Sequence, residues 1–195
     1  MRGRRLLAPL LVAYVLGSSA LALPAAADVL HQFVARDGIS GQFNQNILSP
    51  EGGVLDQSSG DFKLLKPHFF WWHITTPDNQ LMVAIDKTLT QIDWDLEVTV
   101  ERQLSDTERS PFYWLLAPRE TLLAAFTLDA TTSAVTLTPR DESSYYQRVE
   151  VTQENPDLWR ITLLDQGGQS IDITLSGSPE ARLAPSDFSL PSVNF

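Results

Sequence analysis

The sequence predicts a mainly β protein built on one curled antiparallel sheet, with short helices inserted. Short apolar segments separated by turn residues recur from residue 42 to residue 175. Residues 96–101 alternate strictly between apolar and polar side chains, as in a sheet with one wet face. Only residues 111–126 have the composition of a helix over a longer stretch. An antiparallel sheet of this many strands must curl closed or be covered on its apolar face.

Residues 1–27 are predicted to be a cleaved secretory signal. Arg2, Arg4 and Arg5 precede an apolar run over residues 6–16, and three alanines end the segment at Ala27. An uncleaved anchor and a twin-arginine signal are the alternatives. The remaining residues, 28–195, suit a single domain with a hydrophobic core.

Charge and cysteine usage limit the partners. Loss of the three signal arginines leaves 11 Lys and Arg against 24 Asp and Glu, a formal net charge of −13. This balance argues against nucleic acid and anionic lipid surfaces as partners. The chain has no cysteine, so it has neither disulfides nor a residue that could be acylated as in a lipoprotein. It is therefore expected to be free in the periplasm.

In the first half of the mature chain, residues 29–36 have helical spacing and end at Asp37-Gly38. The strands predicted next cover residues 42–48, 60–65, 69–75 and 81–85. The last two are expected to form a hairpin through Pro77-Asp78-Asn79.

In the second half, residues 89–92 and 96–101 are predicted strands. Within residues 111–126, Pro118 should divide the helical stretch into two short helices. The final predicted strands are 135–138, 148–153, 159–165 and 169–175, the last two joined at Gly167-Gly168. A Pro-rich tail follows.

Motifs of catalysis are missing from the sequence. The three histidines, His31, His68 and His73, lack a second ligand at zinc-like spacing. There is no Gly-x-Ser-x-Gly elbow and no glycine-rich phosphate loop. The sequence therefore predicts a protein that is not an enzyme, with no catalytic residue, cofactor or metal.

Four consecutive aromatic residues, Phe69 to Trp72, raise the main question about function. In a strand, Phe70 and Trp72 point to one face while Phe69 and Trp71 point to the other. This pattern fits a central strand buried on both faces. It equally fits a curled sheet whose apolar interior holds a ligand. Periodicity does not distinguish a filled interior from one that can be filled.

Residues 59–104 resemble the LolA family of periplasmic outer-membrane lipoprotein carrier proteins. The matching features are Gly60, Lys66-Pro67, Phe70-Trp71-Trp72, residues 77–83 (PDNQLMV) and Leu89 to Asp93. Further matches are Phe43-x-Gln45, Pro111-Phe112 with Leu115-Leu116, residues 135–140 (VTLTPR) and residues 187–191 (DFSLP). Together they span nearly all of the mature chain.

The resemblance implies an incomplete antiparallel barrel closed by a helical lid, as in LolA and LolB. It implies a monomeric periplasmic chaperone that binds the acyl chains of lipoproteins. The inner-membrane transporter LolCDE would release these lipoproteins, and the carrier would deliver them to the acceptor LolB at the outer membrane of a Gram-negative cell. LolB is anchored by an acylated cysteine, so the missing cysteine favours the soluble carrier.

The resemblance also assigns roles to residues. Lys66 stands where the family commonly has an arginine that helps to control the lid; a solvated lysine at a strand end is the alternative. A lysine keeps the charge but loses the planar fork of donors. The residues expected to line the acyl-chain cavity are Phe62, Leu64, Phe70, Trp72, Leu81, Val83, Phe112, Leu115 and Leu116.

Other functions remain open from the sequence. A protein of the same fold could carry another amphiphile, such as a glycolipid or an apolar metabolite. It could also act as a sensor of mislocalised lipoproteins, although 168 residues leave little room for a second interaction domain. A secreted hydrolase is a further alternative.

Overall fold

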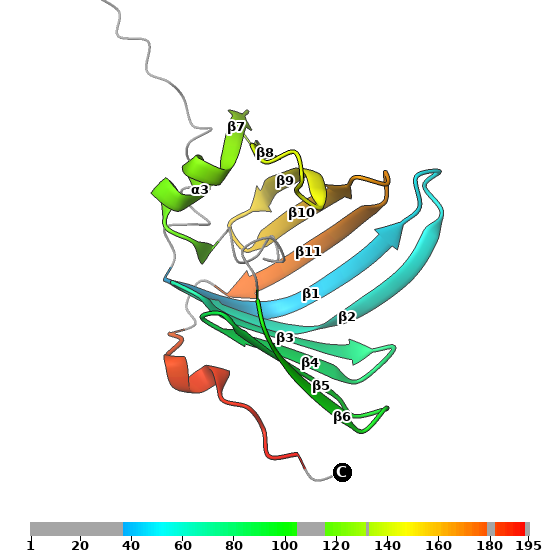
Figure 1. Cartoon of the computed structure of the whole chain (residues 1–195), viewed down its shortest axis with the longest axis vertical. Coiled ribbons are helices and arrows are strands. Elements are labelled where there is room, and N and C mark those ends of the chain that lie inside the picture. The colour runs from blue at the N-terminus through cyan, green and yellow to red at the C-terminus, as the bar shows by residue number, and fades with distance from the viewer. Residues whose placement is uncertain (1–36, 105–115, 132, 179–181, 194–195) are drawn as a thin grey trace, which may run out of the picture.

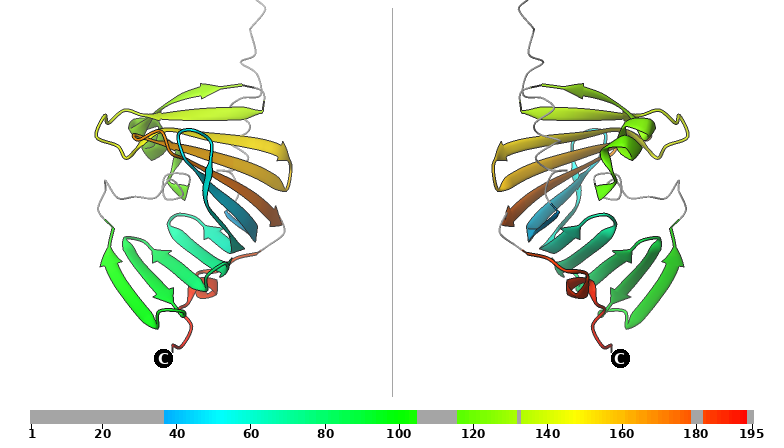
Figure 2. Two further views of the ribbon diagram at one scale, coloured as in Figure 1. Left: turned by 90° about the vertical axis from the view of Figure 1, so that its right-hand side faces the viewer. Right: turned by 90° about the vertical axis from the view of Figure 1, so that its left-hand side faces the viewer.

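The described part of the chain forms one 11-stranded antiparallel sheet, in the order β6-β5-β4-β3-β2-β1-β11-β10-β9-β8-β7 (Figures 1 and 2). The computed structural model describes residues 37–104, 116–131, 133–178 and 182–193. The strands are β1 (Gly38–Leu48), β2 (Val54–Leu65), β3 (Phe69–Thr76), β4 (Gln80–Ile85), β5 (Thr88–Asp93), β6 (Val98–Gln103), β7 (Phe126–Ala130), β8 (Ala134–Pro139), β9 (Tyr146–Asn155), β10 (Leu158–Asp165) and β11 (Ser170–Ser178). The sheet curls, but β6 and β7 remain its two edges, which confirms the predicted incomplete barrel.

Two short helices accompany the sheet in the described residues: α3 (Arg119–Ala125) and the 3₁₀ helix η1 (Pro185–Phe188). Pro118 is the N-cap of α3, so the predicted break at this proline is confirmed. The helical prediction ran one residue too far, because Phe126 already begins β7, a strand that we did not predict. The predicted helix over residues 29–36 lies outside the described residues.

Most predicted strands are present, and several are longer than predicted. The exception is the beginning of β6, because Leu96 lies in the turn between β5 and β6. All six residues of β6 are exposed. The apolar face that the alternation of residues 96–101 predicted to be buried is therefore exposed on β6. None of the helices in the described ranges has the length and apolar character needed to cross a membrane.

The faces of the sheet carry two separate apolar clusters. The larger cluster lies on the concave side, which we call the inner face, and includes Phe43, Phe62, Leu64 and Trp72. The smaller cluster lies on the other side, the outer face, and consists of Leu65, Leu81, Val83, Ile92 and Phe188. Strand β3 contributes to both clusters because successive side chains alternate between the faces.

Glycine at position 60 permits a close approach of β2 and β3. A Cβ atom there would collide with the carbonyl oxygen of His73. The register between the two strands shifts at Ser59 and Gly60. Irregularities and glycines of this kind let a strand bend. The position opposite Gly60 on β1 is Phe43.

The outer cluster is closed by the C-terminal segment. The Phe188 side chain is fully buried, and its ring centroid lies 5.4 Å from that of Phe69. The Lys63 ammonium donates a hydrogen bond to the carbonyl oxygen of Asp187 at 3.1 Å and lies 4.7 Å from the ring centroid of Trp71. Phe69 and Trp71 therefore lie on the outer face. The C-terminal segment covers them there and stabilises the fold.

A side-chain hydrogen bond joins one polar residue of β4 to one of β5. Gln80 and Asp93 are paired in register, and Gln80 Nε2 donates to Asp93 Oδ2 at 2.9 Å. The other carboxylate oxygen of Asp93 accepts a hydrogen bond from the Leu96 backbone N–H at 2.9 Å. Asp93 is only 6% exposed, so these bonds replace the water that its carboxylate has lost.

We predict that Asp93→Ala lowers the free energy of unfolding by about 2 kcal/mol, since it removes two hydrogen bonds to a charged acceptor and leaves the Gln80 amide without its partner. Urea unfolding of Asp93→Ala, Gln80→Ala and the double variant measures this effect. The two single losses should sum to more than the loss in the double variant. Strictly additive losses would show that the pair does not interact.

We also predict that Phe188→Ala costs about 3 to 5 kcal/mol, the range for truncating a buried phenylalanine. Leu190→Ala is the matched control, because Leu190 is 45% exposed and its truncation should change stability by about 0.5 kcal/mol or less. Thermal or urea unfolding checks both variants. Equal effects at the two positions would contradict the assignment of Phe188 as the cover of the outer cluster.

Candidate functional site: the apolar inner face

Three phenylalanine rings gather around Trp72 on the inner face. The ring centroids of Phe43 and Trp72 lie 3.7 Å apart, and the two rings are stacked with an interplanar angle of 26°. Phe70 lies nearly parallel to Trp72 with centroids 5.8 Å apart, and Phe62 is tilted against it at 6.1 Å. Trp72 is 2% exposed. The neighbouring strands β1, β2 and β3 therefore build one rigid aromatic floor.

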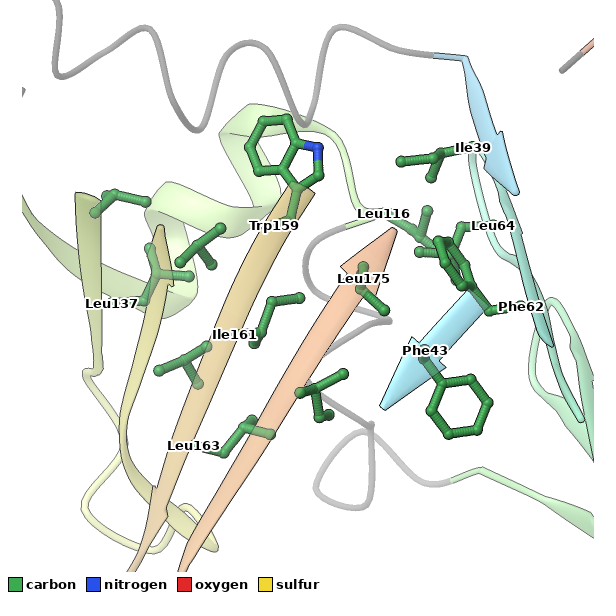
Figure 3. Packing of buried hydrophobic residues seen from close by; sticks show 14 of the residues in the cluster. Ile39, Phe43, Phe62, Leu64, Leu116, Leu137, Trp159, Ile161, Leu163 and Leu175 are labelled. Atoms are coloured by element: carbon green, nitrogen blue, oxygen red, sulfur yellow. The ribbon is translucent and has the colours of Figure 1, made fainter. Parts of the chain in front are cut away.

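On β8 to β11 the inner face is mostly a fully buried core. The side chains of this region project into the concave side from adjacent strands, as Figure 3 shows for Leu137, Trp159, Ile161, Leu163 and Leu175. Each of these five is 2% exposed or less. Leu122 of α3 is also fully buried in the same cluster. The chain's own side chains fill this part of the interior.

Other apolar side chains on the inner face are only half-buried. These residues pack against the core but keep an accessible surface: Phe70, Ile74, Met82, Leu128, Tyr146 and Ile171. Three of them, Phe70, Ile74 and Met82, lie on β3 and β4. Single exposed apolar residues are common, but these three share one face of two paired strands, and apolar surface gathered in one place marks a binding groove or interface. Their surfaces are therefore candidates for contact with an apolar ligand.

The structure brings together five of the nine predicted cavity residues. Phe62, Leu64, Trp72 and Leu116 are buried members of the inner cluster, and Phe70 packs against them. Leu116 comes from the segment that precedes α3 and points toward this cluster (Figure 3). Phe112 and Leu115 lie outside the described residues.

Leu81 and Val83 do not share that face. Val83 is paired with Trp71, and Leu81 with His73, so both side chains lie on the outer face. They pack in the cluster that Phe188 closes. The inner face of β4 is formed instead by Met82, which is paired with Trp72. We therefore correct the predicted set and remove Leu81 and Val83 from the residues that line the inner face.

Sequence reasoning missed Met82 for an identifiable reason. Leu81 and Val83 are the more strongly apolar residues of β4, but apolarity alone does not show which face of this strand turns inward. The signal that finds Met82 is the hairpin register, because Trp72 and Met82 each lie five residues from Pro77, at the centre of the turn. Ile74 follows directly from the two-residue period that begins with Phe70 and Trp72.

Lys66 lies immediately beyond the end of β2. Its backbone N–H donates a hydrogen bond to the carbonyl oxygen of Asp37 at 2.9 Å. Partial burial lowers the pKa of the Lys66 ammonium, and the nearby Asp37 carboxylate opposes this shift. Within the described ranges the ammonium forms no hydrogen bond, so its control of a lid stays a prediction.

Tyr146 is the ionisable group among the half-buried inner residues. Burial raises the pKa of its phenol, and the neighbouring Tyr145 and the Asp165 carboxylate add to the increase. The phenol is therefore neutral at physiological pH, and it adds no charge to the apolar face. Among the described residues, no three potential metal ligands lie close enough together to hold a metal ion.

An open curled sheet with an apolar, partly exposed inner face is the architecture of proteins that enclose apolar ligands. Comparisons with known proteins place the chain more narrowly. Residues 35–191 match the family model of outer membrane lipoprotein carrier protein LolA. The chain belongs to the LolA family.

Relatives agree with this assignment, and a solved structure shares the fold. The outer-membrane lipoprotein carrier protein of Aliivibrio fischeri is 30% identical over 176 residues, covering 89% of this chain and 88% of the relative. That of Vibrio cholerae is 32% identical over 161 residues, covering 81% and 80%. A domain from Vibrio parahaemolyticus assigned to outer-membrane lipoprotein sorting is 10% identical, with a TM-score of 0.50 over 84% of this chain and 95% of that domain. The last comparison shows the fold alone.

We predict that Lys66→Met makes the protein more stable than wild type at pH 7, because it removes an ammonium group that is partly withdrawn from water. The difference should shrink as the pH rises toward 10.5, the ordinary lysine pKa, since folded Lys66 then loses its proton before the unfolded chain does. Urea unfolding at pH 7 and pH 10 measures the change. Lys87→Met, at the exposed turn between β4 and β5, is the matched control. A gap that stays constant with pH would contradict the burial of Lys66.

Proposed function

We propose that this protein is a periplasmic carrier that hides the acyl chains of lipoproteins on its inner face. In this proposal it receives lipoproteins from the transporter LolCDE and delivers them to the acceptor LolB. The observation that carries the proposal is the partly accessible apolar surface of the half-buried Phe70, Ile74 and Met82 beside the buried Trp72. Membership of the LolA family supports acylated proteins as the ligand.

The energetics of acyl chains explain why a carrier is needed. One chain of about 16 carbons carries roughly 12 kcal/mol of hydrophobic transfer energy, at about 0.8 kcal/mol per CH₂ group. A protein with two or three such chains cannot cross water unaided. A carrier that enclosed every methylene group would exceed the practical affinity limit of about 18 to 21 kcal/mol. It would then fail to release its cargo.

The inner face combines a buried part with a partly exposed part, and this fits the need for incomplete enclosure. The fully buried residues of β8 to β11 keep the fold intact without ligand. The half-exposed residues of β3 and β4 offer apolar contact without a closed pocket of matching shape. We infer that binding is loose enough for transfer and that its direction depends on the partners. The sequence has no nucleotide-binding motif, so an ATP-driven transporter would supply the energy of loading.

The direct test of this function is depletion of the protein in its cell. Lipoproteins destined for the outer membrane should then accumulate in the inner membrane, and an acylated protein should co-purify with the carrier from periplasm of untreated cells. Recovery of a free small lipid in place of acylated protein would favour a carrier of another amphiphile. Unchanged lipoprotein distribution after depletion would reject the proposed function.

We predict that Phe70→Glu reduces the release of lipoproteins from spheroplasts by roughly tenfold or more, because a carboxylate on the inner face opposes burial of an acyl chain. The variant should still fold, since Phe70 is half-buried. Thr75→Glu is the matched control, because Thr75 is an exposed residue of the same strand. Release is measured as acylated protein in the supernatant, and circular dichroism checks the fold. Normal release by Phe70→Glu would reject this residue as part of the site.

A further inference from the structure

The inner face of β4, β5 and β6 contains a polar side chain in an apolar row. Cross-strand pairing places Trp72, Met82, Gln91 and Val100 side by side on four adjacent strands. Met82 packs against the inner cluster, and Val100 is 49% exposed on the edge strand. Gln91 lies between these two apolar residues and is half-buried.

The other glutamines of this region have partners of their own. Gln80 Nε2 donates to Asp93, and Gln103 Nε2 donates to Thr88 Oγ1 at 2.9 Å. By contrast, the Gln91 side-chain amide makes no hydrogen bond within the ranges that the structure describes. A primary amide offers two donors and an acceptor. Because Gln91 is only half-buried, water can satisfy its amide without a ligand, and a ligand that displaces this water must replace its hydrogen bonds.

The neighbours of Gln91 indicate what kind of partner would fit. On the same face, Val98 is 43% exposed, and the Asp93 carboxylate already accepts hydrogen bonds from Gln80 and Leu96. The surroundings of the amide thus combine accessible apolar surface with one polar group that remains available. A ligand with a long apolar part and a neutral hydrogen-bond acceptor near one end matches this arrangement.

We propose that Gln91 binds the carbonyl group of the ester or amide linkage that joins an acyl chain to its amphiphile. The amide N–H groups of Gln91 donate to the carbonyl oxygen, while Val98 and Val100, on the far side of Gln91 from Met82, contact the part of the amphiphile beyond the linkage. The chain then crosses Met82 to reach Trp72 and Phe70. Strands lie about 4.8 Å apart, so β3 is about 10 Å from β5, a span that a long acyl chain readily covers.

This inference rests on the proposed function and makes it more specific. It assigns an orientation to the ligand, with the tail over the aromatic floor and the polar linkage at the free edge of the sheet. It also separates two contributions to binding. The apolar residues bind any long chain, whereas Gln91 distinguishes a chain attached through a carbonyl group from one attached through an ether.

The test compares two probes that differ only in this linkage: 1-palmitoyl-lysophosphatidylcholine, an ester, and 1-O-hexadecyl-lysophosphatidylcholine, an ether. Binding to the mature chain is measured by titration calorimetry below the micelle concentration of either probe. We expect wild type to bind the ester roughly threefold to tenfold more tightly, the range for one neutral hydrogen bond. Gln91→Leu should lower the affinity for the ester to that for the ether and leave ether binding at least as strong.

Gln103→Leu is the matched control, because Gln103 carries the same side chain on the outer face of β6, and it should keep the preference for the ester. Retained ether binding shows that each variant is folded. Equal affinities of wild type for both probes, or an ester preference that survives Gln91→Leu, would overturn the role of Gln91 while leaving the carrier function intact. Binding of neither probe by wild type would count against both the role of Gln91 and the proposed function.

Discussion

Alternation of side chains along β3 is the constraint on which this protein depends. Phe70 and Trp72 join the inner cluster, while Phe69 and Trp71 belong to the outer one. A single strand thus connects two apolar regions with different purposes. Because the period of a strand is two residues, neither region can be changed by a shift in register without disturbing the other.

The outer cluster stabilises the sheet where the inner face is least filled. Strands β3 to β5 have half-exposed residues on the inner face, so burial there contributes less to folding than burial on β8 to β11. The C-terminal segment compensates on the other side, where Phe188 is fully buried against this region. The sheet can therefore keep its curvature without a ligand, and the inner face needs no tightly packed filling.

The two halves of the inner face differ in how fully their side chains are buried. On β8 to β11, most apolar side chains of the inner face are fully buried together with Leu122 of α3, as in an ordinary core, and Tyr146 and Ile171 are the half-buried exceptions. On β3 to β6, apolar surface remains accessible, and one amide, that of Gln91, has no partner in the described chain. Stability and ligand contact are thus assigned to different strands of one continuous sheet, and a change at Phe70 need not unfold the protein.

The sequence by itself determined the fold class, most of the strands and the break at Pro118, because these follow from local period and turn chemistry. It also determined that Phe70 and Trp72 share a face. Only the tertiary structure decided which side of β4 faces inward, because that depends on the hairpin register, and the more apolar pair, Leu81 and Val83, proved to lie on the outer face. Likewise, only the fold brings Phe188 to Phe69 and Val100 to Gln91. These contacts join residues that are distant along the chain or on neighbouring strands, and a period of two residues holds no information about them.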